Sequence, residues 1–303
     1  MEQRKTLREL TLLDRFLFNE TMEKPENMQA VLEIILGKEV MLKYLPQSEK
    51  EQRTSPVFRY VKLDVWTQDE DDVVYEIEAQ KLNTGNLPKR SRYYQGLIDS
   101  KLLEPGVNDF DELNPVFVII IMPFDLFKKE KYRYTFTMKC EEAAGVDLND
   151  GAVRIFLNTH GKDDDGVSPE LKELLYFIEH TNDQGMVFRS EKVNRIRKSV
   201  RSIQDNEEVG IRYMQEWEEK LMYQRMARQE GLEEGRREGR KEGRKEMQSV
   251  IDEAKHKLNK AHEREIQTFL NLLERGMSQE EVQGITNSGE DIVREALQRF
   301  PVG

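Results

Sequence analysis

The sequence predicts a mixed α/β domain followed by a charged, all-helical extension. Strand-like stretches alternate with helical patterns over residues 1–190, which is typical of an α/β or α+β core. Beyond residue 190 the pattern is helical, and residues 230–246 form a low-complexity repeat, EGLEEGRREGRKEGRKE. We therefore divide the chain into a core domain (1–190), a charged helical segment with the repeat (191–250) and a small C-terminal helical region (251–303).

The first half of the core contains a predicted β-hairpin between two helical stretches. Residues 6–45 have clustered apolar side chains at helical spacing, and Gly37 ends the second cluster. A polar loop is expected over 47–56. Residues 57–66 and 73–80 then alternate between apolar and polar side chains, as strands do, and the acidic stretch 67–72 joins them. A helix is expected over 89–103.

The second half of the core adds strands and one well-marked helix start. The apolar run between Pro115 and Pro123 predicts a buried strand, and 132–138 and 153–158 are further strand candidates. Ser168 and Pro169 have the residue types favoured at the N-cap and first turn of a helix. Near the end, Ser278 begins a capping-box sequence and a helical hairpin over 278–299, broken at 287–289.

The negative charge of the chain lies in the core. The 303 residues carry a net charge of −11, from 47 basic and 58 acidic residues. Residues 191–303 hold 22 basic and 23 acidic residues, a net of −1, so residues 1–190 hold 25 and 35, a net of −10. A dense mixture of both signs is typical of a solvated helix with side-chain pairs such as Glu233–Arg237 and Glu238–Lys241, and not of a basic DNA-binding tail.

Composition excludes several classes of protein. One cysteine, Cys140, cannot form a disulfide framework or a cysteine-rich zinc site. No apolar run approaches 18 residues, and the N-terminus lacks the apolar segment of a signal peptide. We expect no membrane span and a cytoplasmic protein.

The hairpin carries polar side chains that could bind a metal ion. Strand periodicity puts Glu76, Glu78 and Gln80 on one side of the second strand and Asp64 on one side of the first. A turn centred near residues 69–70 would place Asp64 opposite Glu76, with Glu78 as a diagonal neighbour. Two such carboxylates can share Mg²⁺ or Mn²⁺. The alternative is that these residues form the solvent face of an edge hairpin.

A resemblance favours the metal site. Asp64, followed 13 residues later by Glu78-Ala79-Gln80, resembles the PD-(D/E)XK nuclease core in a form that ends in glutamine. The wider sequence is similar to the Rpn family of recombination-promoting nucleases, whose members are also described as transposases. The similar segments are TLLDRFLFNETM at Thr11, AVLEIILG at Ala30, VYEIEAQ at Val74, RSRYYQGLIDSKLLEPG at Arg90, PVFVIIIMPFD at Pro115, YTF at Tyr134, DG at Asp150, IFLNTHG at Ile155 and the EGxxEG repeat.

The resemblance implies a PD-(D/E)XK nuclease-like core, with a mixed central sheet flanked by helices, and metal-dependent cleavage of DNA. It implies that Asp64, Glu78 and the backbone carbonyl of Ala79 bind Mg²⁺ or Mn²⁺. Gln80 stands where the superfamily usually has lysine. An amide carries no positive charge, so Gln80 would act on the attacking water in a different way from that lysine.

Two further sets of residues follow from the resemblance. Superfamily enzymes often have an acid on the first core helix, for which Glu33 is the candidate and Asp14 the alternative. On the helix over 89–103, Arg90, Arg92 and Gln95 are candidates for binding DNA phosphates. We expect the neighbouring Tyr93 and Tyr94 to pack in the core.

The predicted function is that of a Mg²⁺-dependent DNA endonuclease of the recombination-promoting type. The alternative is an inactive nuclease-fold module that binds or regulates a partner through its helical tail. Glycines four residues apart, at 231, 235, 239 and 243, predict either a solvated helix or a close seam between two copies of the chain. The second interpretation predicts a homo-oligomer.

Overall fold

The structure is a computed structural model that describes residues 5–52, 61–102 and 109–299. Its chain divides into two compact units, Met1–Trp217 and Glu218–Gly303, which are described separately. None of the helices in the described part of the chain is both long and apolar enough to cross a membrane.

The first unit contains a six-stranded mixed sheet with the strand order β1-β2-β3-β4-β6-β5. Strands β3 and β4 form its centre and run parallel, as do β4 and β6, whereas the other neighbours are antiparallel. The strands are β1 (Gln47–Gln52), β2 (Val61–Gln68), β3 (Val74–Ala79), β4 (Val116–Met122), β5 (Arg133–Phe136) and β6 (Ala152–Asn158).

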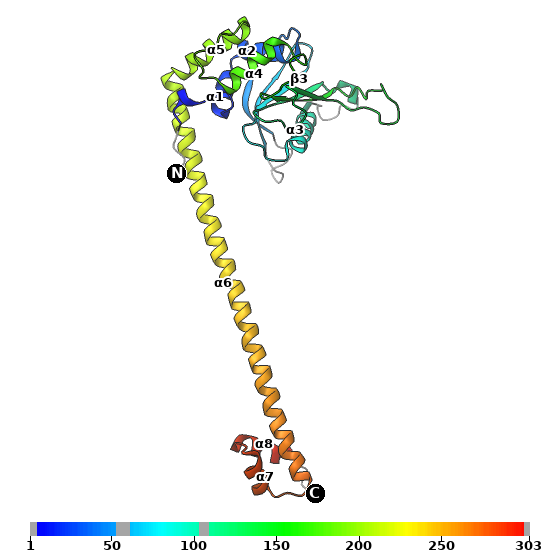
Figure 1. The fold of residues 1–303 in the computed structure, drawn as a ribbon, viewed down its shortest axis with the longest axis vertical. Coiled ribbons are helices and arrows are strands. Elements are labelled where there is room, and N and C mark those ends of the chain that lie inside the picture. Colours follow the sequence, from blue (N-terminus) through cyan, green and yellow to red (C-terminus); the bar gives the residue numbers. More distant parts are fainter. Residues whose placement is uncertain (1–4, 53–60, 103–108, 300–303) are drawn as a thin grey trace. The chain divides into compact units, whose positions relative to one another are not determined.

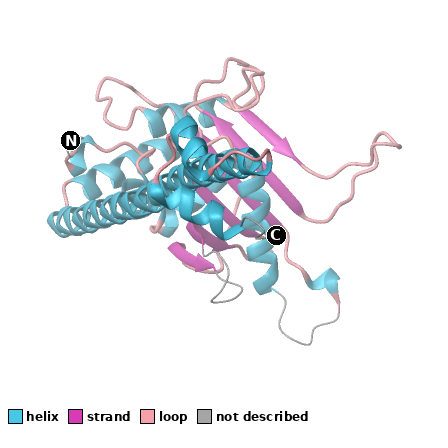
Figure 2. Ribbon diagram, turned by 90° about the horizontal axis from the view of Figure 1, so that it is seen from below, coloured by secondary structure: helices cyan, strands magenta, loops and turns pink. Residues whose placement is uncertain are grey.

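Helices cover both faces of this sheet, which confirms the predicted fold class (Figures 1 and 2). One face packs against α1, α2, α4 and α5 in the larger core, and α3 packs against the other face. The bounds are η1 (Leu7–Glu9), α1 (Arg15–Met22), α2 (Pro25–Leu36), α3 (Leu87–Leu102), η2 (Phe110–Glu112), α4 (Pro169–Glu179) and α5 (Glu191–Gln204). Because β3 is covered on both faces, all six of its residues are buried.

Several local signals are confirmed. Gly37 ends α2 in the left-handed conformation, with φ of 68°, which glycine adopts without steric cost. The Ser168 hydroxyl accepts a hydrogen bond from the backbone N–H of Leu171 and so caps α4. In the hairpin, Tyr75 and Ile77 face the larger core, which leaves Glu76 and Glu78 together on the side of α3.

The predicted register of the hairpin is wrong by two residues. Trp66, and not Asp64, pairs with Glu76, and the neighbouring pair is Val65 with Ile77. The reason is the turn: β2 continues to Gln68, and the chain reverses over residues 69–73, with Asp72 at a φ of 62°. Continuing this register places Asp64 opposite Glu78.

Other expectations on the core also need correction. Residues 47–52 form the edge strand β1 rather than a loop, because pairing with β2 uses backbone groups and needs no apolar side chains. The predicted strand residues 57–60 and helix residue 103 lie outside the described residues. Tyr94 is buried as expected, but Tyr93 is 42% exposed because it falls one position away from the buried face of α3.

The first unit extends beyond residue 190, the expected limit of the core. Helix α5 buries four apolar side chains against α1, α2 and α4, each worth about 1.5–3 kcal/mol of transfer free energy. These are Val193, Ile196, Val200 and Ile203. The helix therefore belongs to the same hydrophobic core as the sheet.

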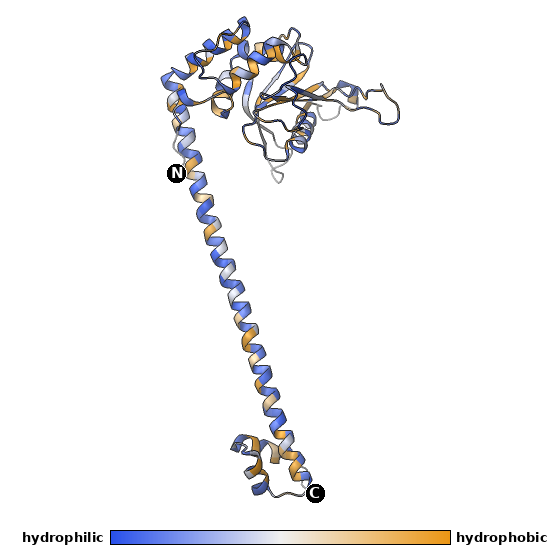
Figure 3. Ribbon diagram, viewed as in Figure 1, coloured by the Kyte–Doolittle hydropathy of each residue, from blue (hydrophilic) through white to orange (hydrophobic). Residues whose placement is uncertain are grey.

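The region beyond α5 is helical, as predicted. Helix α6 (Glu207–Glu274) contains the whole repeat, whose residues are exposed on all sides. Figure 3 shows its middle part as almost entirely hydrophilic. At its C-terminal end, α7 (Gln279–Thr286) and α8 (Glu290–Arg299) form a small apolar core with α6 residues such as Ile266 and Phe269. The predicted capping box at Ser278 is present.

Candidate metal centre

Asp64 lies in β2 where this strand stops pairing with β3. The described ladder between the two strands ends at Val65–Ile77, and the backbone N–H of Asp64 instead donates to Oε1 of Glu76, at 3.2 Å. The Asp64 carboxylate is buried and forms an ion pair with Arg15 of α1, at 2.8 Å between Nε and Oδ1. The side chain of Asp64 is thus held by Arg15 at the start of α1, and its backbone N–H is held by the carboxylate of Glu76.

Glu78 and Gln80 lie at the end of β3 and share one guanidinium group. Nη2 of Arg90, from the first turn of α3, donates hydrogen bonds to Oε1 of Glu78 and to Oε1 of Gln80. Glu78 is buried, whereas Gln80 lies partly exposed after the strand. Ala79, between them, turns its side chain into the larger core on the other face.

Among the unsatisfied buried polar atoms in this part of the structure, three acceptor oxygens face one donor, Nε of Arg90. Oε2 of Glu76, Oε2 of Glu78 and Oε1 of Gln95 are buried and have no hydrogen-bond partner. An unsatisfied buried polar atom costs about 1–3 kcal/mol, and more when it is charged. Acceptors left unsatisfied in this way suit a bound cation, because a cation offers the positive charge that they lack.

The carboxylates repel one another. Burial and the charge of Asp64 raise the pKa of Glu78 to about 7, although Arg90 and Arg15 act in the opposite direction. Burial, with the charges of Asp64 and Glu78, raises the pKa of Glu76 well above its usual value. Three carboxyl groups therefore face two guanidinium groups, and a proton or a metal ion is needed to balance the remaining negative charge.

The structure does not bring Glu33, the predicted first-helix acid, into this group. Its carboxylate binds Lys192 of α5 at 2.9 Å and accepts a hydrogen bond from Gln29. Asp14, the alternative, lies beside the group: it precedes Arg15, and its Oδ1 binds Nζ of Lys81 at 2.6 Å. Of the two acids, the position of Asp14 fits the resemblance better.

The three predicted phosphate-binding side chains have different surroundings. Arg90 is engaged with Glu78 and Gln80. Gln95 is buried on the inner face of α3, and Arg92 is exposed. Only Arg92 is therefore open to a phosphate group at the surface in this conformation.

Sequence reasoning missed Arg15 and Lys81 and left Glu76 without a role. No periodic signal could reveal the Arg15–Asp64 pair, because it joins residues 49 positions apart that meet only in the folded chain. Strand periodicity could have indicated Glu76, because it shares the strand face of Glu78. Lys81 lies out of phase with that face, so the only sequence signal for it is its place directly after the motif.

The donor set fits a hard divalent cation with few protein ligands. Among the described residues, no group of three or more His, Cys, Asp or Glu side chains is arranged to hold a metal ion. Two carboxylates, a backbone carbonyl and several waters are nevertheless the ligands that Mg²⁺ commonly takes. Asp64 and Glu78, with the free Oε2 of Glu78, could supply the two carboxylates.

The comparison with protein families agrees with this fold. A family model described as PD-(D/E)XK nuclease family transposase matches residues 15–230, which includes Asp64, Glu78 and Gln80. No curated protein and no solved structure gives a significant match. The family match covers more than two thirds of the 303 residues. The chain belongs to the PD-(D/E)XK nuclease family transposases.

Proposed function

We propose that the chain is a cytoplasmic, Mg²⁺- or Mn²⁺-dependent DNA endonuclease of the recombination-promoting type. One observation carries the proposal: Asp64 and Glu78, the two predicted carboxylate ligands, are buried, and Oε2 of Glu78 has no hydrogen-bond partner. Burying carboxylates close together destabilises a fold, so their presence is explained if they bind a cation that the reaction uses.

The site residues divide into ligands and positioning groups. Asp64, Glu78 and the carbonyl of Ala79 would hold the ion, which supplies Lewis acidity for activating water and for neutralising charge on a phosphodiester. Arg15 holds Asp64 in place, and Arg90 holds Glu78.

Gln80 orients its neighbours and does not take up a proton. Its Oε1 accepts from Arg90, and its Nε2 donates to the carbonyl oxygen of Leu82. An amide has no basic nitrogen, so the proton of the attacking water would pass to solvent, and a bound metal ion would lower the pKa of that water. Arg92, exposed on α3, would contact the DNA backbone near the site.

The test is cleavage of supercoiled plasmid by the full chain. We expect nicked and linear products with Mg²⁺ or Mn²⁺ and none with EDTA, because the carboxylate pair needs the ion. Cleavage that persists in EDTA would contradict the proposal. Absence of cleavage with plasmid, linear duplex and single strands alike would favour the alternative, an inactive module that binds a partner.

We also propose that the glycines of the repeat form a seam between two copies of the chain. A Cβ atom added at Gly231, Gly235, Gly239 or Gly243 would meet no atom within 4 Å, so this face is open in the single chain. Each glycine costs a helix about 1 kcal/mol relative to alanine, and close contact with a second backbone would offset that cost.

Light scattering of the full chain tests the seam. We expect a mass of at least twice 35.8 kDa. Gly235→Leu with Gly239→Leu should give a monomer, because leucine favours helix but holds the backbones apart. A control with leucine at Gln248 and Asp252, four residues apart and outside the repeat, should keep the wild-type mass. A monomeric wild type would refute the seam.

A further inference from the structure

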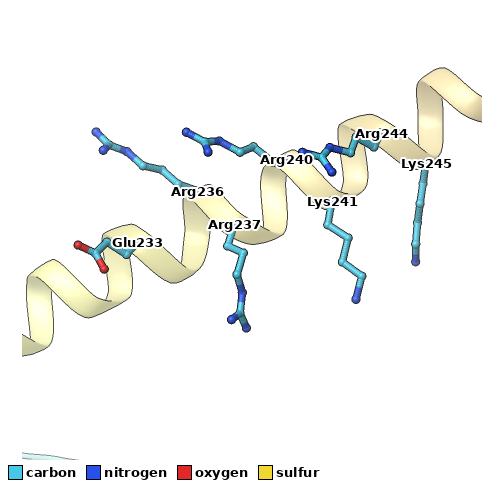
Figure 4. A pocket seen from close by; sticks show the side chains of 7 residues that line it. All are labelled: Glu233, Arg236, Arg237, Arg240, Lys241, Arg244 and Lys245. Atoms are coloured by element: carbon cyan, nitrogen blue, oxygen red, sulfur yellow. The ribbon is translucent and has the colours of Figure 1, made fainter.

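The middle of α6 carries a dense row of cations that the function described above does not use. Six of the ten residues from 236 to 245 are basic. Figure 4 shows them in two rows along the helix, where with Glu233 they line a surface hollow. One row consists of Arg236, Arg240 and Arg244, and the other of Arg237, Lys241 and Lys245.

The four-residue repeat separates the charges by helix face. At 3.6 residues per turn, the six basic positions fall within about half of the helix circumference. The other half, over the same residues, holds only Glu238, Gly239, Glu242 and Gly243. Although the net charge of the tail is close to zero, the charged residues on this half of the helix between 236 and 245 are therefore all basic.

The basic side chains are available to a partner. None of the six forms an ion pair with any carboxylate among the residues that the structure describes, and all six are exposed. The pairs expected from the sequence, Glu233–Arg237 and Glu238–Lys241, do not form. Because the seam proposed for the glycines uses the opposite half of the helix, pairing of two copies would leave the basic face open.

We propose that the basic face, defined as the six cations between 236 and 245, binds the phosphate backbone of duplex DNA. Ten helical residues span about 15 Å, which gives one cation per about 2.5 Å. Duplex DNA presents one negative charge per about 1.7 Å, a comparable linear density. The family match ends at residue 230, before this segment begins. The inference rests on the proposed function for its choice of DNA as the partner.

The surrounding sequence favours DNA over a membrane surface. A helix that lies on a membrane needs an apolar face to enter the lipid as well as cations for the headgroups. Residues 233–246 contain no apolar side chain larger than glycine, and Figure 3 shows this stretch as hydrophilic. Arginine and lysine in line, without apolar neighbours, bind phosphates without reading bases, so the expected binding is independent of DNA sequence.

The test is the salt dependence of duplex binding by the full chain, measured by fluorescence anisotropy in EDTA so that no cleavage occurs. Replacing Arg236, Arg240 and Arg244 by glutamine should weaken binding at least tenfold. It should also reduce the slope of log affinity against log salt by about three, because each phosphate contact contributes about 0.9.

A matched control removes three cations elsewhere on α6. Glutamine at Lys255, Lys257 and Lys260 makes the same change in net charge but at positions scattered around the helix, and should leave affinity and slope unchanged. Equal effects of the two triple variants, or no binding by the wild type, would overturn the inference. So would a loss confined to anionic phosphatidylserine vesicles, with duplex binding unchanged.

Failure of this inference can be told apart from failure of the proposed nuclease activity. If the wild type cleaves plasmid but the arginine variant binds duplex as tightly as the wild type, the basic face is refuted and the nuclease stands. If the basic face binds DNA as expected but no cleavage occurs with any metal, the nuclease is refuted and the basic face stands.

Discussion

Replacing Glu78 by glutamine is expected to abolish DNA cleavage and, at the same time, to stabilise the metal-free protein. Loss of a metal ligand should lower the cleavage rate on the order of a thousandfold or more, which corresponds to about 4 kcal/mol of transition-state stabilisation. A residue that only supports the fold would have the opposite effect on stability, because its removal normally destabilises.

The gain in stability follows from the pKa of Glu78. The pKa is about 7 in the folded protein and 4.5 for an ordinary glutamate. Between these values the folded state keeps a proton that the unfolded state has lost, so stability falls as pH rises from 4.5 to 7. The total loss is about 3 to 4 kcal/mol, since one pKa unit corresponds to about 1.4 kcal/mol. Glutamine does not titrate and avoids this loss.

Thermal unfolding in EDTA measures the effect. We expect the midpoint of Glu78→Gln to exceed that of the wild type at pH 8 and to match it near pH 4.5. Glu70→Gln is the control, because Glu70 lies in the turn of the same hairpin but is exposed. It should change neither cleavage nor unfolding. Full activity of Glu78→Gln, or an equal shift in both variants, would show that Glu78 is no ligand.

The candidate motif could be predicted from the sequence because it depends on local periodicity. Two alternating stretches predict a hairpin, and period two then assigns Glu76, Glu78 and Gln80 to one face. The alternative, that these residues form a solvent face of the hairpin, is wrong because of another part of the chain. Helix α3 covers that face, so Asp64, Glu76 and Glu78 are buried.

The remaining contacts of the site depend on segments that are distant in sequence. Arg15 forms an ion pair with Asp64, 49 positions away in the sequence, and Lys192 forms one with Glu33, 159 positions away. The register of β2 on β3 depends on a turn in which Asp72 adopts the left-handed conformation. The sequence does not distinguish Asp72 from its acidic neighbours as the residue that takes this conformation. Strand β1 has no apolar pattern in its sequence, and it joins the sheet through backbone pairing with β2.

The second large effect concerns competition between protons and the metal ion at Glu78. A carboxylate must lose its proton before it can bind a cation. Because the pKa of Glu78 is about 7, we expect Mg²⁺ affinity to fall about tenfold for each unit of pH below 7 and to level off above it. Titration calorimetry of the full chain from pH 5.5 to 8.5, without DNA, measures this affinity directly.

Proton release separates this explanation from a general effect of pH. At pH 6 a group with a pKa of 7 is about 90% protonated, so binding one Mg²⁺ should release about 0.9 proton, against about 0.1 at pH 8. Calorimetry in buffers of different ionisation enthalpy counts these protons. Glu70→Gln should behave as the wild type does, and Glu78→Gln should release none. A carboxylate with the ordinary pKa of 4.5 would already be ionised throughout this range. A flat affinity between pH 6 and 8 would therefore show that Glu78 is not buried among like charges as the structure has it.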